Sequence, residues 1–201
     1  MVRVLIAEDM RILRDTLAAL LNLEDDLDVV AELGSGDEIV PAALRHRPDV
    51  AVLDIDLPGT DGLTAAAQLH QALPACRTLI LTGLGRPGTL RRALAAHASG
   101  FVVKDAPSQQ LVDAVRRVAA GERVIDAALA VATLEASDNP LSPRETEVLK
   151  RHAGGASAAE IATAMHLSYG TVRNYLASAV TKLGARNRVD AARIADEAGW
   201  L

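Results

Sequence analysis

The chain has 201 residues, half of them hydrophobic but only four aromatic, so its core must consist mainly of Ala, Leu, Val and Ile. That length allows one large domain or two small ones. No apolar stretch approaches the roughly 20 residues of a membrane-spanning helix, and no secretory signal pattern opens the chain. The single cysteine, Cys76, excludes an internal disulfide and fits a reducing compartment. We therefore expect a cytoplasmic protein without direct membrane contact.

The net charge of −5 at pH 7 is unevenly distributed along the chain. Residues 1–141 hold 13 basic and 20 acidic side chains, whereas residues 142–201 hold 8 basic and 6 acidic ones. Between Ser168 and Arg188 there are four basic residues and no acidic residue. An acidic first part joined to a locally basic second part indicates that only the second part meets a polyanion.

The first 121 residues alternate short apolar runs with helical patterns. Runs this short and rich in Val, Ile and Leu are typical of buried parallel strands. Strands are predicted at residues 2–7, 27–33, 50–53, 78–81 and 101–103. Helices are predicted at residues 12–21, 36–47, 62–72, 86–98 and 108–120. Five βα units of this length predict an α/β domain over 1–121, with a doubly wound five-stranded parallel sheet and helices on both faces.

Residues 122–141 are predicted to be a linker that contains a helix over 126–136, which Ser137-Asp138-Asn139-Pro140 would end. Residues 142–201 are then predicted to form an all-α domain of four helices. Capping boxes at Ser142-Pro143-Arg144-Glu145 and Ser157-Ala158-Ala159-Glu160 open the first two helices. The third is expected at 169–183 and the fourth at 188–198. Two short helices joined by a tight turn, the second longer and basic, predict a helix-turn-helix.

Polar side chains follow or end four of the five predicted strands of the first domain. Glu8 and Asp9 follow the first strand, Asp54 the third, Thr82 the fourth and Lys104 the fifth. Because ligands of open α/β sheets bind beyond the carboxyl ends of the strands, we expect these side chains at one rim. A hydroxyl and an ammonium at that rim can bind the oxygens of a phosphoryl group.

The carboxylates at this rim predict a Mg²⁺-dependent phosphorylation site. Mg²⁺ prefers one or two carboxylates together with phosphate oxygens and water. Glu8, Asp9 and Asp54 are therefore candidate ligands, with the backbone carbonyl of Asp56 as a further one. An Asp carboxylate can itself act as a nucleophile and form an aspartyl phosphate.

The first domain closely resembles the flavodoxin-like receiver domains of response regulators. The matching segments are Leu5-Ile6-Ala7-Glu8-Asp9, Leu53-Asp54-Ile55-Asp56-Leu57-Pro58-Gly59, Leu79-Ile80-Leu81-Thr82 and Gly100-Phe101-Val102-Val103-Lys104-Asp105. The resemblance implies that Asp54 accepts a phosphoryl group from a sensor histidine kinase. It implies that Asp9 and Asp54 hold Mg²⁺, with Glu8 acting through water. Thr82 and Phe101 match the family's switch positions: Thr82 would move toward the phosphate and Phe101 would turn into the vacated space.

Two enzymatic alternatives compete with the receiver interpretation. The glycine spacing of a dinucleotide-binding loop occurs at Gly83-Leu84-Gly85-Arg86-Pro87-Gly88. This segment follows the fourth strand, and a dinucleotide site there would leave the carboxylates at the rim unexplained. Asp54-Ile55-Asp56 has the D-x-D spacing of haloacid-dehalogenase-like phosphohydrolases. Pro58 stands where that family has Thr or Val, and the motif lies on the third strand, so the receiver interpretation is favoured.

The third helix of the second domain presents polar side chains opposite its apolar face. The predicted DNA contacts, on this helix and just after it, are Thr171, Arg173, Asn174, Ser178, Lys182 and Arg188. Arg can pair with guanine and Asn with adenine in the major groove, whereas Lys182 and Arg188 suit phosphates, which position a protein without specifying sequence. A solvated basic face on a helical bundle is the alternative.

The second domain resembles the LuxR-type helix-turn-helix. The matching segments are Leu141-Ser142-Pro143-Arg144-Glu145, Glu160-Ile161-Ala162, Thr171-Val172-Arg173-Asn174-Tyr175, Lys182-Leu183-Gly184 and Asn187-Arg188. The whole chain thus resembles a NarL/FixJ-type response regulator. This implies a transcription factor rather than an enzyme, whose phosphorylation promotes homodimerisation and binding to double-stranded promoter DNA. A phosphorylation-independent DNA-binding regulator with a vestigial receiver is the alternative.

Two finer features bear on partners. Segments 21–26 and 82–88 resemble those of regulators of membrane-lipid desaturation, which would imply a membrane-bound kinase and lipid-gene promoters. Ala191, Ala192 and Ala195 make the fourth helix of the second domain similar to the helix through which such domains pair on DNA. Packing of these alanines inside the bundle is the alternative.

Overall fold

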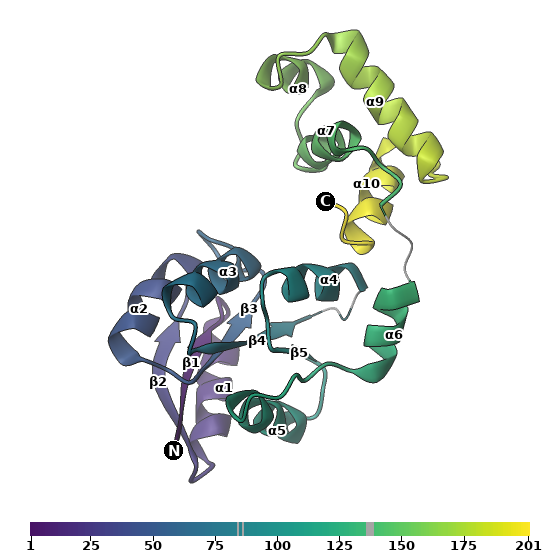
Figure 1. The fold of residues 1–201 in the computed structure, drawn as a ribbon. Helices are drawn as coiled ribbons and strands as arrows, with labels where there is room; N and C mark the ends of the chain where they lie inside the picture. The colour runs from purple at the N-terminus through teal and green to yellow at the C-terminus, as the bar shows by residue number, and fades with distance from the viewer. Residues whose placement is uncertain (84, 86, 136–138) are drawn as a thin grey trace. The chain divides into compact units, whose positions relative to one another are not determined.

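The computed structural model describes residues 1–83, 85, 87–135 and 139–201. These residues fall into two units, one within residues 1–85 and 90–130 and the other within 86–89 and 131–201 (Figure 1). None of the helices in these described ranges is long and apolar enough to cross a membrane.

The first unit contains a five-stranded parallel sheet, as predicted. Its strands are β1 (Val2–Ala7), β2 (Leu27–Leu33), β3 (Val50–Asp54), β4 (Arg77–Thr82) and β5 (Gly100–Val103). They lie in the order β2-β1-β3-β4-β5, and every neighbouring pair is parallel. The carboxyl ends of all five strands therefore meet at one edge of the sheet, as the predicted site requires.

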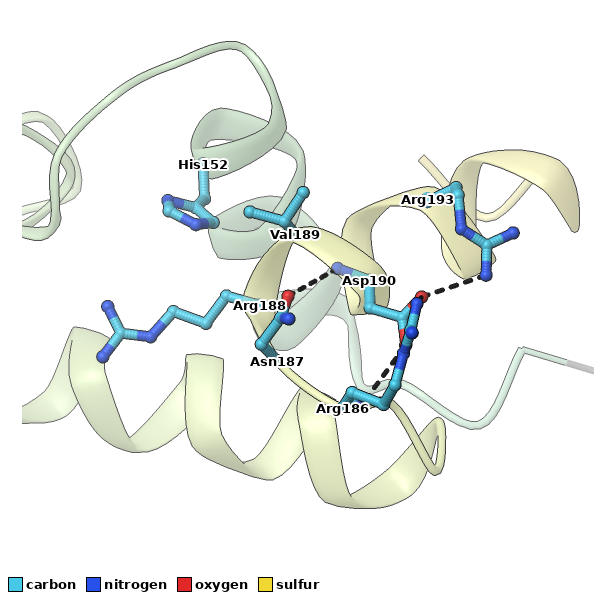
Figure 2. A pocket seen from close by; sticks show the side chains of 7 residues that line it. All are labelled: His152, Arg186, Asn187, Arg188, Val189, Asp190 and Arg193. Atoms are coloured by element: carbon cyan, nitrogen blue, oxygen red, sulfur yellow. Dashed lines mark hydrogen bonds and ion pairs between the residues drawn. The ribbon is translucent and has the colours of Figure 1, made fainter.

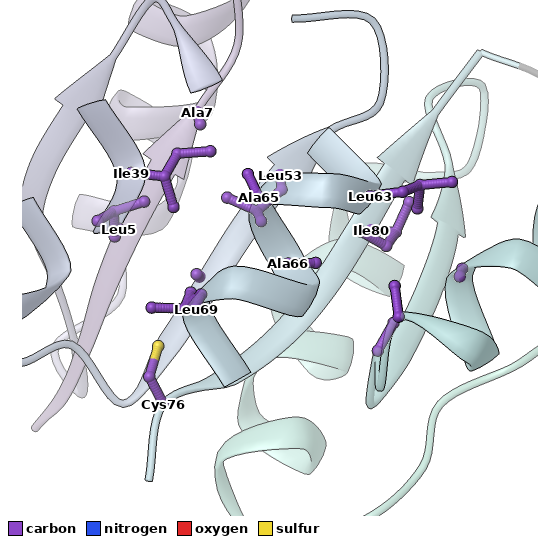
Figure 3. Packing of buried hydrophobic residues seen from close by; sticks show 14 of the residues in the cluster. Leu5, Ala7, Ile39, Leu53, Leu63, Ala65, Ala66, Leu69, Cys76 and Ile80 are labelled. Atoms are coloured by element: carbon purple, nitrogen blue, oxygen red, sulfur yellow. The ribbon is translucent and has the colours of Figure 1, made fainter. Parts of the chain in front are cut away.

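Helices cover both faces of this sheet. They are α1 (Arg11–Asn22), the 3-10 turn η1 (Gly36–Glu38) with α2 (Ile39–His46), α3 (Gly62–Ala72), α4 (Pro87–Ala95) and α5 (Ser108–Ala119). Successive side chains of a strand point to opposite faces, so the sheet has two cores. Leu5, Leu53 and Ile80 pack with α2, α3 and α4 on one face (Figure 3), whereas alternate strand residues pack with α1 and α5 on the other.

The loop that follows β3 is held by a close approach to the loop that follows β2. A Cβ atom on Gly36 would lie only 1.7 Å from the carbonyl oxygen of Thr60, so only glycine fits there. Asp37 Oδ1 accepts hydrogen bonds from Thr60 N at 3.0 Å and from Thr60 Oγ1 at 2.6 Å. These contacts fix the segment that begins directly after Asp54.

The second unit is all-helical. After α6 (Ala127–Glu135), which begins in the first unit, it contains α7 (Pro143–Ala153), α8 (Ala158–Ala164), α9 (Tyr169–Lys182) and α10 (Arg188–Glu197). Both predicted capping boxes form. The helices share a core that includes Leu149, Ile161 and Leu176, against which Trp200 packs. The predicted helix end at 136 and the residues 137–138 of the predicted break lie outside the described residues.

Candidate functional site

Three carboxylates converge at the carboxyl edge of the sheet. Glu8 and Asp9 follow β1, and Asp54 ends the adjacent strand β3, where Ala7 and Leu53 are paired. One carboxylate oxygen from each lies within 4.8 Å of the other two. Glu8 and Asp54 are buried, whereas Asp9 is exposed. Like charges at this spacing repel, so the arrangement requires a cation.

Lys104 supplies positive charge to two of these carboxylates. Its Nζ lies 2.8 Å from Glu8 Oε2 and 3.0 Å from Asp54 Oδ2. Burial raises the pKa of Glu8 above its usual value, and the ion pair with Lys104 offsets this only in part. Burial by itself would lower the pKa of Lys104, but its hydrogen bonds to Glu8 and Asp54 outweigh that effect and raise the pKa. The ammonium therefore stays charged between the carboxylates.

The cluster also fits a divalent cation. Glu8 Oε2 is fully buried, and apart from the ion pair with Lys104 it has no well-directed hydrogen bond to the described residues. Oxygen donors in this number and of this charge are typical of the Mg²⁺-binding phosphorylation site of receiver domains. Asp56 is exposed two residues beyond Asp54, and the use of its backbone carbonyl as a ligand stays a prediction.

The two predicted switch residues lie on neighbouring strands. Thr82 is buried at the end of β4, and its carbonyl oxygen accepts a 2.7 Å hydrogen bond from Lys104 N. Phe101 on β5 is paired with Ile80 and lies buried in the core on the α3 and α4 side. Their movement on phosphorylation stays a prediction.

Sequence analysis missed Arg14 on α1. Its Nη1 donates a 2.6 Å hydrogen bond to the backbone carbonyl of Glu8. The contact joins the start of α1 to the acidic cluster and places another cation near it. No pattern in the sequence distinguishes this arginine from a solvated one, because the contact depends on how α1 packs against the sheet.

The glycine-rich segment that suggested a dinucleotide loop can be followed only in part, because Leu84 and Arg86 lie outside the described residues. A Cβ atom on Gly85 would lie 2.9 Å from Val103 Cγ1. A side chain at this position would therefore require Val103 to shift, which gives this glycine a packing role beside β5 without a nucleotide.

The predicted base contacts lie near the start of α9. Arg173 and Asn174 are exposed, and Thr171 is half-buried. The guanidinium of Arg173 lies 5.9 Å from the centre of the Tyr169 ring, a cation–π contact. Thr171 N donates to Ser168 Oγ at 3.0 Å and so caps the helix. The base contacts of Arg173 and Asn174 stay predictions.

Two other predicted DNA residues on α9 contact Glu145 of α7, and their contacts with DNA stay predictions. Ser178 Oγ donates to Glu145 Oε1 at 2.6 Å, and Lys182 Nζ lies 2.6 Å from Glu145 Oε2. That carboxylate also completes its capping box by accepting from Ser142 N at 2.6 Å. Burial alone would raise the pKa of Glu145, but these hydrogen bonds lower it to about 2. The sequence indicated the capping box but not this link between α7 and α9.

Arg188 borders a hollow of about 520 Å³ at the start of α10 (Figure 2). In the described chain its guanidinium has no ion pair, unlike those of Arg186 and Arg193, each 3.0 Å from the buried Asp190. The predicted contact of Arg188 with a DNA phosphate stays a prediction. Ala191 and Ala195 are fully buried and pack inside the bundle, whereas Ala192 is half-buried. Pairing of domains through α10 stays a prediction.

Known families match both parts of the chain. The model of the response regulator receiver domain matches residues 4–116, and that of the luxR family of bacterial regulatory proteins matches residues 139–195. The response regulator RamR of Streptomyces coelicolor is 46% identical over 100% of this chain and 98% of its own. The transcriptional regulatory protein DesR of Bacillus subtilis is 40% identical over the full length of both. The solved complex of the response regulator RcsB with DNA has a TM-score of 0.69 at 25% identity and covers 98% of each chain.

Proposed function

This chain belongs to the two-component response regulators that carry a LuxR-type DNA-binding domain, and from that premise we propose that phosphorylation of Asp54 switches it into a promoter-binding homodimer. Membership of this family makes it a transcription regulator rather than a catalytic enzyme, so the phosphohydrolase and dinucleotide alternatives are rejected. A receiver domain implies a cognate histidine kinase. We propose that this kinase is a membrane-bound sensor and that the regulator acts in the cytoplasm.

The observation that supports the proposal is the position of Asp54 beside Lys104, Glu8 and Asp9. A carboxylate oxygen of Asp54 would attack the phosphorus of a phosphohistidine, and the imidazole would leave as the acyl phosphate forms. Mg²⁺ held by Asp9 and Asp54, with Glu8 acting through water and the Asp56 carbonyl as a further ligand, would neutralise the charge that accumulates on the phosphoryl oxygens. Lys104 already bridges Glu8 and Asp54, so a small displacement would bring its ammonium to a phosphoryl oxygen.

The signal would leave the site through Thr82 and Phe101. The Thr82 hydroxyl would hydrogen-bond a phosphoryl oxygen, and the Phe101 ring would turn into the space that Thr82 leaves. Couplings of this kind are typically worth about 1–3 kcal/mol. Such an energy changes the equilibrium constant between the inactive and active states by roughly 5–150-fold.

The active dimer would place two copies of α9 in successive major grooves of a two-fold site. Arg173 and Asn174 would read bases, with Thr171 and Ser178 beside them. Lys182 and Arg188 would bind phosphates. The solved complex of the related RcsB with DNA supports DNA binding by this chain. The likeness to DesR alone does not select lipid-gene promoters, because RamR is more identical over the same length.

Intact-mass spectrometry after incubation with acetyl phosphate tests the phosphorylation step. We expect one phosphoryl adduct that requires Mg²⁺, disappears in Asp54→Asn and persists in the matched control Asp56→Asn. Sizing of the same samples should show dimers only where the adduct forms. If neither acetyl phosphate nor beryllofluoride with Mg²⁺ changes the wild-type protein, the receiver is vestigial and the protein binds DNA independently of phosphorylation.

Selection from a random DNA library tests the base contacts. Arg173→Ala and Asn174→Ala should relax the selected sequence, since each good pair contributes about 1–3 kcal/mol of discrimination. Arg188→Ala should weaken binding equally for all sequences. Unchanged selectivity in the first two variants would refute the proposed readout.

A further inference from the structure

A polar pocket lies at the edge of the sheet opposite to the one that holds Asp54. Its volume is about 220 Å³, and it opens at the amino ends of β4 and β5. Thr78 lies near the start of β4 and Ser99 directly before β5, and both line it. Because β4 has six residues and a strand rises about 3.3 Å per residue, this pocket is separated from the phosphorylation site by about the length of a strand.

Positive charge dominates the pocket. Arg77 and Arg123 supply this charge, and Glu122 is the one carboxylate of the lining among the described residues. His70 and His97 also line the pocket. Glu122 is already neutralised by Arg117, whose Nε lies 2.7 Å from Glu122 Oε2.

The guanidinium groups of Arg77 and Arg123 are free to bind an anion. The neighbouring carboxylate of Asp49 is engaged by Arg3 N at 2.8 Å. In the described ranges neither Arg77 nor Arg123 forms an ion pair, so neither guanidinium is satisfied by a carboxylate of the chain. A guanidinium presents a rigid fork of donors that matches phosphate and carboxylate groups.

The backbone holds these groups in place. Gly121 has φ +95°, and a Cβ atom there would lie 3.2 Å from Arg77 Nη2, so the guanidinium lies against a glycine that leaves room for it. The rings of His70 and His97 stack with centroids 4.3 Å apart and planes inclined by 15°. The pocket is thus preformed by three separate segments of the chain.

We propose that this pocket binds a small polyanion with phosphate or carboxylate groups, clamped by Arg77 and Arg123 and oriented by the His70–His97 stack. The hydroxyl groups of Thr78 and Ser99 would supply further hydrogen bonds. The volume suits an anion of few heavy atoms, because pockets for drug-sized ligands start at about 300 Å³. The site lies outside the phosphorylation and DNA-binding functions proposed above.

A metal ion is a poorer fit to the same residues. The lone pairs of an imidazole lie in the ring plane, so two nearly parallel stacked rings do not direct them at one ion. The nearby Cys76 is buried, and burial raises the pKa of its thiol to about 12. It therefore stays protonated at neutral pH, whereas a metal requires the thiolate.

Histidine ring signals in NMR spectra of the full-length protein test the proposal. Pyrophosphate and citrate, titrated separately without Mg²⁺ in 150 mM NaCl, distinguish a phosphate ligand from a carboxylate one. The chain has five histidines. We expect saturable shifts at His70 and His97 with at least one of the anions. His152 and His166 lie in the second unit, so they report on anions bound by its basic helices and should not follow the same curve.

The double variant Arg77→Gln/Arg123→Gln should weaken the apparent affinity at least tenfold. Both side chains are exposed, so neither change opens a cavity. Arg45→Gln/Arg47→Gln removes the same net charge at residues that do not line the pocket and should leave the titration unchanged. The proposal is overturned if neither anion gives saturable shifts at His70 and His97, or if both double variants weaken binding equally. Saturation by Zn²⁺ but by neither anion would likewise replace the anion site by a metal site.

Discussion

Replacing Glu145 by Gln should destabilise the second unit by an amount that depends on pH. The carboxylate is buried with only 5% of the residue exposed, and it accepts hydrogen bonds from Ser142 N, Ser178 Oγ and Lys182 Nζ, each at 2.6 Å. Gln keeps the size of the side chain and one acceptor oxygen. It removes the charge, so one of these donors loses its acceptor and the ammonium of Lys182 loses its counter-ion.

The lowered pKa of Glu145 sets the size of the effect. The difference between an ordinary Glu, with a pKa of about 4.3, and the value of about 2 in the folded protein corresponds to about 3 kcal/mol. Since the side chain of Lys182 is 40% exposed, solvent screening reduces this to about 1–2 kcal/mol. A carboxylate whose pKa is lower in the folded protein than in the unfolded chain stabilises the folded state at pH values above the unfolded-chain pKa. The contribution is therefore complete above about pH 5 and is lost as the pH falls from about 4.3 to about 2.

The single tryptophan of the chain makes the assay selective. Trp200 packs against the core of the second unit, so its fluorescence during urea unfolding reports on that unit. The matched control is Glu160→Gln, which changes the same position of the other capping box, where the carboxylate is exposed and accepts from Ser157 N. We expect a loss of about 1–2 kcal/mol for Glu145→Gln at pH 7 and a clearly smaller loss for the exposed Glu160→Gln. Equal losses, or a loss for Glu145→Gln that stays constant between pH 5 and pH 2.5, would refute the reasoning.

Three further predictions concern the cation site, the helical core and the loop beside Asp54. In calorimetry, Mg²⁺ at one hundred times its dissociation constant should stabilise the first unit by about 2.7 kcal/mol. Asp9→Asn should remove most of this stabilisation. An undiminished stabilisation in that variant would mean that the ion binds elsewhere. Leu176→Ala empties a fully buried position and should lower the unfolding free energy measured by Trp200 fluorescence by about 2–5 kcal/mol; a loss below 1 kcal/mol would mean that α9 is not packed as described. Gly36→Ala should lower calorimetric stability by about 1–3 kcal/mol, because the added Cβ would meet the Thr60 carbonyl. The control Gly83→Ala has open space around its Cβ and should change stability by less than about 0.5 kcal/mol. Equal effects of the two variants would contradict the close approach at Gly36.

The parallel sheet and the acidic cluster were predictable because both depend on local patterns. Each strand is a short apolar run that ends in a polar residue, and parallel pairing brings all these ends to one edge. Glu8, Asp9, Asp54 and Lys104 therefore had to meet once the strand order was β2-β1-β3-β4-β5. The helix starts were equally local, because Ser142 and Ser157 cap their own first turns.

Contacts between distant segments were not predictable in the same way. Helical periodicity places Ser178 and Lys182 on the polar side of α9. It does not show that both side chains also contact Glu145 of α7. Periodicity gives the face of a helix and not the neighbour that covers it. The alanines of α10 illustrate the same point, since burial and not composition decides that Ala191 and Ala195 are core residues.

The arrangement of the acidic cluster has a consequence for protein synthesis. Its members come from the first strand, the third strand and the end of the fifth, so the cluster spans the chain from Glu8 to Lys104. A nascent chain still lacking residue 104 carries the carboxylates without their ammonium, and its sheet lacks β5. Because domains generally fold as units, the ability to accept phosphate should appear in one step when the whole receiver has left the ribosome. Incomplete chains would then take no phosphate from the kinase, and the signal would reach only molecules whose receiver is fully folded.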